Sequence, residues 1–233
     1  MKWVLCPGLD ELSRHATDVF VRRSQNAIEA RGRLIVALSG GHTPLDLFQR
    51  LAEPEQAARV DWSAVHVLWV DERCVPPEDP ASNYRAAREA LLSHVSIPAS
   101  NVHRIQGERP PMEAAEAYEE DVRDLLGPGG RIDLALLGLG ADGHTASLFP
   151  GHPALAKADR WAIAVETAAT PPWRVTLTLP VLNAARSVLF LVAGAEKADA
   201  VRRVQSGEDL PATRVAPTEG ELIWLVDRDA AGG

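Results

Sequence analysis

The chain has 233 residues, of which 46% are hydrophobic and 24% are charged, and both fractions are ordinary for a globular protein. This composition excludes a disordered chain, a collagen and a coiled coil. There are 24 lysines and arginines against 32 aspartates and glutamates, so the net charge is −8, and aromatic residues make up only 5%. We therefore expect neither a basic surface for duplex nucleic acid nor stacking platforms for single strands.

The two cysteines, Cys6 and Cys74, are too few and too far apart to form a disulfide framework or a zinc cluster. The segment Met1–Pro7 is too short and turns polar too quickly for a signal peptide. No apolar run approaches the roughly 20 residues that span a bilayer. We expect a cytoplasmic protein with reduced thiols and no membrane association. Because no repeat or linker interrupts the chain, we also expect residues 1–233 to form one domain.

The spacing of apolar residues predicts alternating helices and strands. Helices are expected over residues 10–31, 45–52, 83–95, 112–126 and 195–204. Strands are expected over residues 33–38, 65–70, 132–137, 161–165, 175–179, 188–192 and 222–226. Several of the strand runs are almost entirely apolar rather than alternating, which is typical of parallel strands covered by helices on both faces. The pattern predicts an α/β fold with one doubly wound, mostly parallel sheet.

Three predicted strands end in segments that could bind a ligand, because ligands of open α/β sheets bind beyond the carboxyl ends of the strands. The first segment is Ser39-Gly40-Gly41-His42-Thr43. Its paired glycines let backbone N–H groups approach an anion, and the next helix points its positive end at the same place. The alternative is a tight turn with no ligand. The segment is not a Walker A loop, since no Gly-Lys-Ser/Thr follows.

The second segment is Asp71-Glu72-Arg73, which is either part of a site or the start of a solvated loop. The third runs from Gly138 to Thr145 and places Asp142 two residues before His144. Histidine suits proton transfer near neutral pH, and a neighbouring carboxylate can orient its ring. The alternative is a capped turn with a surface histidine.

Two basic residues on the later elements complete the candidate site. Arg174 precedes the run at 175–179, and Lys197 lies near the start of the predicted helix at 195–204. A cation in the first turn of a helix opposes the helix dipole, which makes sense if an anion binds there. Cys74 is not expected to be a nucleophile, because no glycine turn presents it. The remaining histidines weighed are expected to be structural: His15, His66, His94, His103 and His152.

The most distinctive stretch is Gly140-Ala141-Asp142-Gly143-His144-Thr145-Ala146-Ser147-Leu148-Phe149-Pro150-Gly151. It is accompanied, in order, by residues 38–44, 70–73, 82–84, 173–178 and 194–197. Together these segments cover nearly the whole chain and resemble the 6-phosphogluconolactonases of the glucosamine-6-phosphate isomerase/6-phosphogluconolactonase family.

The resemblance implies a Rossmann-like fold and a carboxylic ester hydrolase. The implied reaction converts 6-phospho-D-glucono-1,5-lactone to 6-phospho-D-gluconate in the oxidative pentose phosphate pathway, in functional coupling with glucose-6-phosphate dehydrogenase and with no metal or organic cofactor. It also implies that His144 is the general base that activates water, with Asp142 beside it. The implied substrate and phosphate contacts are Ser39, Gly40, Gly41, Thr43, Asp71, Arg73, Gly143, Arg174 and Lys197. The roles of Asp71, Glu72 and Asn83 stay open.

Two other functions share the implied scaffold. A glucosamine-6-phosphate deaminase requires a glutamate five residues after the histidine, and Phe149 at that place cannot carry a proton. A non-enzymatic sugar-phosphate sensor would normally carry a basic helix-turn-helix segment, whereas the residues before the first predicted strand are expected to form one helix. Lactone hydrolysis is therefore the favoured interpretation.

Overall fold

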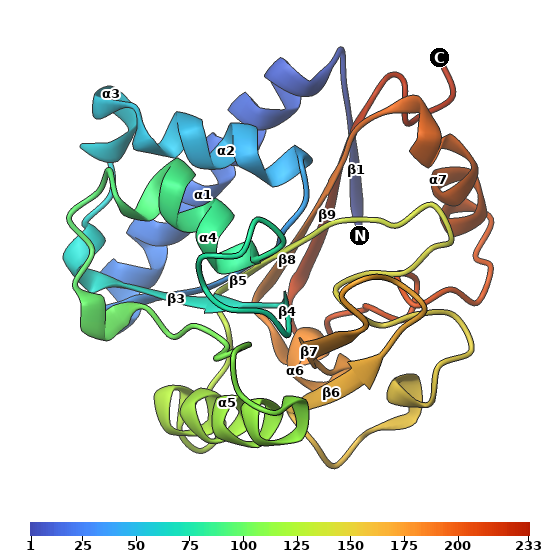
Figure 1. Cartoon of the computed structure of the whole chain (residues 1–233). Helices are drawn as coiled ribbons and strands as arrows, with labels where there is room; N and C mark the ends of the chain where they lie inside the picture. Colours follow the sequence, from blue (N-terminus) through green and yellow to red (C-terminus); the bar gives the residue numbers. More distant parts are fainter.

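The computed structural model describes residues 1–233 and is built on a parallel sheet in the order β1-β9-β8-β5-β2-β3 (Figure 1). Its strands are β1 (Lys2–Cys6), β2 (Leu34–Leu38), β3 (Val65–Trp69), β5 (Leu134–Leu137), β8 (Ser187–Val192) and β9 (Glu221–Asp227). Every residue of β2, β5 and β8 is buried, as their continuous apolar runs predict. The predicted α/β class with a mostly parallel sheet is confirmed.

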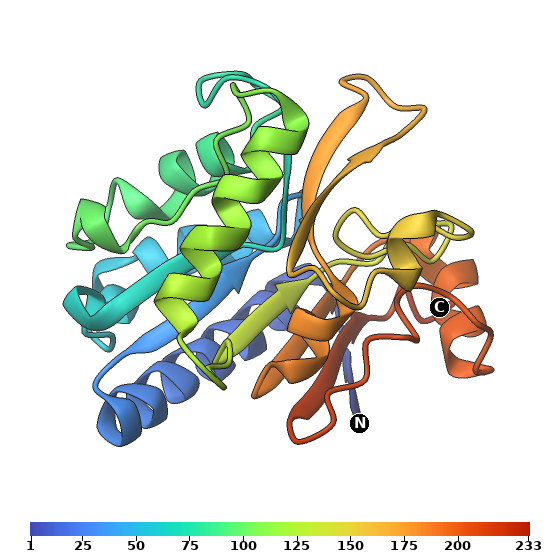
Figure 2. The same cartoon turned by 90° about the horizontal axis from the view of Figure 1, so that it is seen from below.

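Helices cover both faces of this sheet and enclose one continuous apolar core. They are α1 (Leu9–Arg31), α2 (Thr43–Ala52), α3 (Pro54–Ala57), α4 (Asn83–Ala87), α5 (Pro111–Leu126), α6 (Leu179–Ala184) and α7 (Ala198–Gln205). Figures 1 and 2 show α1 and α2 on one face and α5 on the other. The Tyr118 hydroxyl on α5 donates to the Trp69 carbonyl at 2.6 Å and accepts from the Trp69 N–H at 2.8 Å, which ties α5 to β3.

A second, antiparallel sheet of three strands lies beside the parallel one, in the order β4-β7-β6. Its strands are β4 (Asp71–Arg73), β6 (Ala162–Glu166) and β7 (Trp173–Leu177). The β6–β7 hairpin stands away from the parallel sheet (Figure 2), and α5 packs against both of its strands. The sequence analysis did not predict this sheet.

Several predicted boundaries are wrong. The first strand is not at residue 33 but is β1, a short and half-exposed edge strand. The strand predicted at 175–179 ends at Leu177, because Thr178 starts α6 with Pro180 in its first turn. The helix predicted at 83–95 comprises α4 and one π-helical turn over Arg88–Leu92, and that predicted at 195–204 begins with a 3₁₀ turn.

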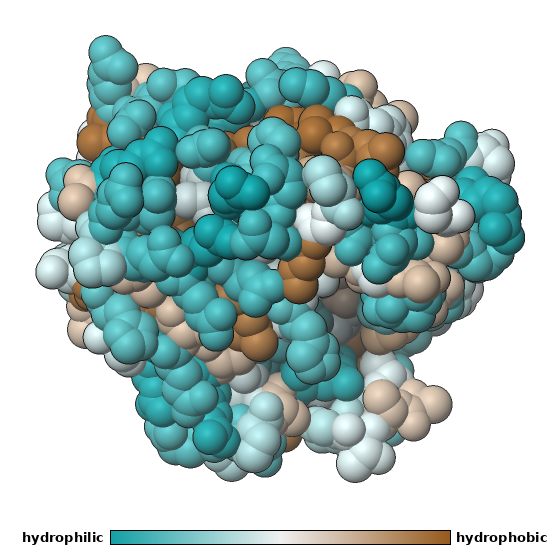
Figure 3. All heavy atoms as spheres, turned by 90° about the horizontal axis from the view of Figure 1, so that it is seen from above, coloured by the Kyte–Doolittle hydropathy of each residue, from teal (hydrophilic) through white to brown (hydrophobic).

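The chain connections leave β2 and β5 in opposite directions: β2 leads outward to β3, whereas β5 leads to β8 and β9. Such a reversal of direction opens a crevice at the carboxyl ends of the two strands. The surface seen from above Figure 1 is mostly hydrophilic, with only small hydrophobic areas (Figure 3). No helix combines the length and the apolar character needed to cross a membrane.

Candidate active site

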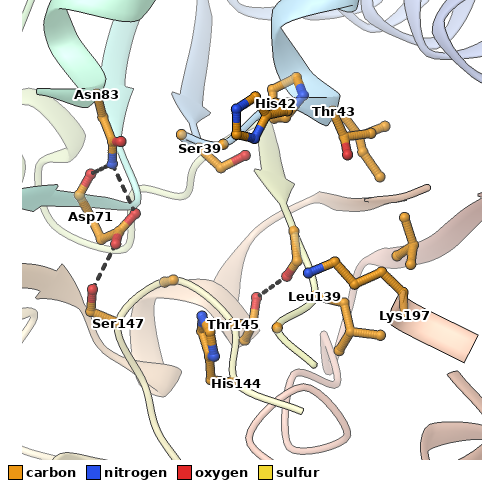
Figure 4. A pocket seen from close by; sticks show the side chains of 18 of the residues that line it. Ser39, His42, Thr43, Asp71, Asn83, Leu139, His144, Thr145, Ser147 and Lys197 are labelled. Atoms are coloured by element: carbon orange, nitrogen blue, oxygen red, sulfur yellow. Dashed lines mark hydrogen bonds between the residues drawn. The ribbon is translucent and has the colours of Figure 1, made fainter. Parts of the chain in front are cut away.

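A cleft of about 440 Å³ lies at the carboxyl ends of β2, β5 and β8 and is closed on one side by β4 and β7. It brings together nine residues predicted from the sequence: Ser39, Gly40, Gly41, Thr43, Asp71, Arg73, His144, Arg174 and Lys197. In Figure 4, Lys197 extends toward the centre from one side, and Asp71 and Asn83 lie on the other. Segments more than 150 residues apart in sequence thus share one site.

His144 lies in the loop that follows β5 and points into the cleft (Figure 4). Its Nδ1 is 2.6 Å from Oδ1 of Asp142, and the same oxygen accepts the His144 backbone N–H at 3.0 Å. Burial raises the pKa of the Asp142 carboxyl, but these two hydrogen bonds outweigh it and hold the pKa below its ordinary value. Because an ionised carboxylate only accepts, the proton of the neutral imidazole lies on Nδ1, and Nε2 keeps its lone pair.

Two neighbours fix the position of the His144 ring. The Phe149 ring packs against it, with ring centroids 4.7 Å apart. On the other side, the Gly140 backbone approaches so closely that a Cβ there would lie 2.0 Å from Nδ1 of His144. The Gly140 N–H also donates to the His144 carbonyl at 2.8 Å. Glycine is thus required at position 140 by a close approach.

We expect Gly140→Ala to lower kcat about 10- to 100-fold, because a displaced His144 ring loses its alignment within the cleft. The measurement is kcat of the folded variant. Gly8→Ala is the matched control, since a Cβ there meets nothing within 4 Å. A Gly140→Ala variant with wild-type kcat would show that the His144 position is not critical.

Three cations line the cleft without an ion-pair partner: Arg73, Arg174 and Lys197. Arg73 and Arg174 lie directly opposite each other in the β4–β7 pair, where like charges destabilise a sheet. Burial, followed by the charge of Arg73, lowers the pKa of Arg174, and its Nη1 is buried with no hydrogen-bond partner. This arrangement is typical of a site whose counter-charge is supplied by an anionic ligand.

The turn from Ser39 to Thr43 supplies further donors. The backbone N–H groups of Gly40, Gly41 and His42 make no hydrogen bond within the protein, and they precede the N-terminus of α2. Ser39 is 6% exposed, and its Oγ is buried without a partner. Unpaired N–H groups and the positive end of a helix dipole both favour an anion here.

Asp71, at the start of β4, is held in a network that the sequence did not reveal. Its Oδ2 accepts the Ser147 hydroxyl at 2.6 Å, and its backbone carbonyl accepts Nδ2 of Asn83 at 2.9 Å (Figure 4). A Cβ on Gly40 would lie 1.9 Å from Oδ1 of Asn83. Asn83 therefore fills the space between the 39–43 turn and β4.

Two of the predicted site residues, Asp142 and Gly143, lie outside the cleft lining, and so do Glu72 and Cys74. Asp142 does not reach the cleft itself but hydrogen-bonds to His144, which does. Gly143 is buried in the turn, with φ of +89°, and a Cβ there would lie 2.8 Å from the Leu210 side chain. Glu72 is buried and does not line the cleft. Burial, and then the charge of Glu72, raise the pKa of the Cys74 thiol to about 11, which disfavours the nucleophilic thiolate.

The lining also contains residues that the sequence analysis did not single out as contacts, among them His42 and Ser147. Both belong to motifs that carry the family resemblance, so their position beside predicted contact residues could have indicated that they line the site. The five histidines expected to be structural do not line the cleft. His66 and His103, for example, bond to each other at 3.2 Å, and His103 also bonds to Asp121 at 3.0 Å. No group of three or more His, Cys, Asp or Glu side chains is placed to hold a metal ion.

Comparison with known proteins shows to which family this chain belongs. A family model described as glucosamine-6-phosphate isomerases/6-phosphogluconolactonase matches residues 7–224. The chain belongs to this family. A 6-phosphogluconolactonase of Nostoc is 40% identical, over 96% of this chain and 94% of that protein. One of Synechocystis is 43% identical, over 89% of this chain and 88% of that protein.

The fold of this family member also matches solved structures. A crystal structure of 6-phosphogluconolactonase from Thermotoga maritima superposes with a TM-score of 0.87 and 31% identity, over 97% of this chain and 99% of that one. The similarity therefore extends over nearly the whole chain, and not over a single motif.

Proposed function

We propose that this protein hydrolyses 6-phospho-D-glucono-1,5-lactone to 6-phospho-D-gluconate, with His144 as the general base. The observation that carries the proposal is the His144–Asp142 pair in a cleft lined by unpaired cations. A base with a free lone pair and an anion-binding wall are the two parts that hydrolysis of a phosphorylated lactone needs. The names of the relatives, which are lactonases, support the same substrate.

In the proposed reaction, Nε2 of His144 removes a proton from a water molecule as its oxygen attacks the lactone carbonyl carbon. The negative charge that develops on the carbonyl oxygen is stabilised by hydrogen-bond donors in the cleft. The bond from the carbonyl carbon to the ring oxygen then breaks, and the imidazolium returns the proton to that oxygen. Asp142 stabilises the imidazolium throughout.

The phosphate is proposed to bind between Arg174, Lys197 and the turn from Ser39 to Thr43. All three line the same cleft, and both cations lack an ion pair. A charged donor next to a phosphate oxygen makes a hydrogen bond roughly twice as strong as a neutral one. We also propose functional coupling to glucose-6-phosphate dehydrogenase, which would supply the lactone.

A coupled assay tests the proposal. Glucose-6-phosphate and its dehydrogenase generate the lactone, and lactone decay is followed at neutral pH with and without this protein. We expect decay clearly faster than the spontaneous hydrolysis of the lactone in water. Decay at the spontaneous rate would refute the proposed function.

The same preparation should release no ammonia from glucosamine-6-phosphate. Deamination needs carboxylates that exchange protons with the histidine, and Phe149 packs an apolar ring against His144 instead. An apolar wall also disfavours a charged amine, because an unpaired buried charge is costly. Ammonia release at a rate comparable to lactone hydrolysis would favour a deaminase.

A further inference from the structure

Glu72 is a buried carboxylate in β4 that the proposed reaction does not use. It is 2% exposed, does not line the cleft and forms no ion pair. Its Oε1 accepts the backbone N–H groups of Arg73 and Asn83, both at 2.7 Å. Its Oε2 accepts the Tyr84 N–H at 2.7 Å and the Ser82 hydroxyl at 3.0 Å. Both oxygens of one carboxylate are thus saturated by donors from two separate segments.

Stability of α4 alone does not explain this carboxylate. The helix has only five residues, and the Ser82 hydroxyl already caps it by accepting the Arg85 N–H at 3.1 Å. Burial raises the pKa of the Glu72 carboxyl, although the four hydrogen bonds act in the opposite direction. An ionised carboxylate at this position therefore costs free energy of folding. A residue with that cost needs another reason to be there.

The donors that Glu72 holds belong to the two segments that form one wall of the cleft. Arg73 lines the cleft from β4, and Asn83 lines it from the start of α4. The Asn83 side chain in turn donates to the Asp71 carbonyl and fills the space over Gly40. A shift of the Asn83 backbone would therefore disturb both β4 and the 39–43 turn.

We propose that Glu72 is a positioning residue, whose carboxylate holds the backbone of Arg73 and of Ser82–Tyr84 so that Arg73 and Asn83 face the substrate. This inference rests on the proposed function. We call the Glu72 carboxylate with its four hydrogen bonds the clamp, and it acts on the cleft wall formed by Arg73 and Asn83. His144 and Asp142 lie on the loop after β5 and make no hydrogen bond to Glu72. Loss of the clamp should therefore weaken substrate binding more than it slows the chemical step.

The test is Glu72→Gln. Whichever way the amide is oriented, its NH₂ group faces at least one backbone N–H that has lost its acceptor. We expect KM for the lactone to rise about tenfold, the usual effect of one unsatisfied buried donor, while kcat changes by less than about threefold. The pH profile of kcat should stay that of the wild type. Hydrogen exchange at the Arg73, Asn83 and Tyr84 amides should become about tenfold faster.

Glu78→Gln is the matched control, since this glutamate precedes the same helix but is exposed and bonds only to Arg88 with its side chain. Its KM should equal that of the wild type. If Glu72→Gln does not fold, Ser82→Ala removes one of the four bonds to the carboxylate, and its KM should rise about two- to threefold. Ser82→Ala with wild-type KM would then overturn the proposal.

The remaining outcomes distinguish a failure of the Glu72 positioning role from a failure of the proposed function. A folded Glu72→Gln variant with unchanged KM and unchanged amide exchange would overturn the positioning role and leave the proposed function intact. A fall in kcat at unchanged KM would also overturn it. If the wild-type protein does not accelerate lactone decay, the proposed function fails. Hydrogen exchange at Arg73 and Asn83 then still decides whether Glu72 clamps the wall.

Discussion

Replacing His144 with alanine should lower kcat for lactone hydrolysis by about 10²–10⁴-fold, the usual contribution of a positioned acid/base group. The fold should survive, because His144 lies in a loop and its side chain is one third exposed. The measurement is lactone decay at saturating substrate, with thermal unfolding to show that the variant is folded. Phe149 and Gly140 would face an empty space, and neither can replace the base.

His94→Ala is the control for this experiment, since His94 is exposed and its side chain bonds only to the Glu89 carbonyl. Its turnover should equal that of the wild type. Asp142→Asn should also lower kcat, because an amide can stabilise the wrong tautomer of His144. A folded His144→Ala variant with near-normal turnover would move the base elsewhere, and Asp71 and Glu196 are the two carboxylates that line the cleft.

The activity at acidic pH should depend on the His144–Asp142 pair. A protonated His144 cannot accept the proton of water, so activity should fall as the pH becomes acidic. The pKa of the Asp142 carboxyl is lowered, so Asp142 stays ionised below the ordinary range of an aspartate. The stabilisation that it contributes is present above its unfolded-state pKa and is lost only as the pH falls through the lower folded-state value. The Asp142–His144 contact should therefore persist below the pH at which an ordinary aspartate is protonated.

Replacing Arg174 with alanine should lower kcat/KM by about 10- to 150-fold, because a charge-assisted hydrogen bond contributes roughly 1.5–3 kcal/mol. Arg174 is half-buried, and its Nη1 has no partner in the protein. The substitution should not lower the thermal midpoint, since it removes a like-charge contact with Arg73 across the β4–β7 pair. Steady-state kinetics and a thermal melt measure the two effects.

Arg22→Ala is the matched control, since Arg22 is an exposed arginine with no ion pair and does not line the cleft. It should leave kcat/KM unchanged. The wild-type enzyme should also hydrolyse the phosphorylated lactone faster than an unphosphorylated one. Equal rates on both lactones would contradict a phosphate site at Arg174.

The parallel sheet and the position of the cleft could be predicted from local sequence. The runs that became β2, β5 and β8 are apolar on both faces, and this composition is typical of strands buried between two layers of helices. The carboxyl ends of parallel strands meet at one edge, so the segments after β2 and β5 had to lie together. The His144–Asp142 contact could be predicted for a similar reason, because the two residues are neighbours in one turn.

The local sequence pattern could not predict β1 or the antiparallel sheet. β1 is a short edge strand with only one fully buried residue, and pairing with β9 places it in the sheet. The segment Asp71–Arg73 is polar and does not resemble a strand, yet pairing with β7 makes it one. Strand propensity depends strongly on the partner, and the partner of β4 lies about a hundred residues away.

By itself, the sequence determined the fold class, the edge of the sheet at which the site lies and nine of the residues that line it, because these follow from local periodicity and from motifs after strands. Only the tertiary structure decided how those residues act on one another. The opposition of Arg73 and Arg174, the Ser147–Asp71 bond and the clamp at Glu72 all join segments that are distant in the chain. Such contacts depend on strand register and on packing across the cleft, neither of which leaves a periodic pattern in the sequence.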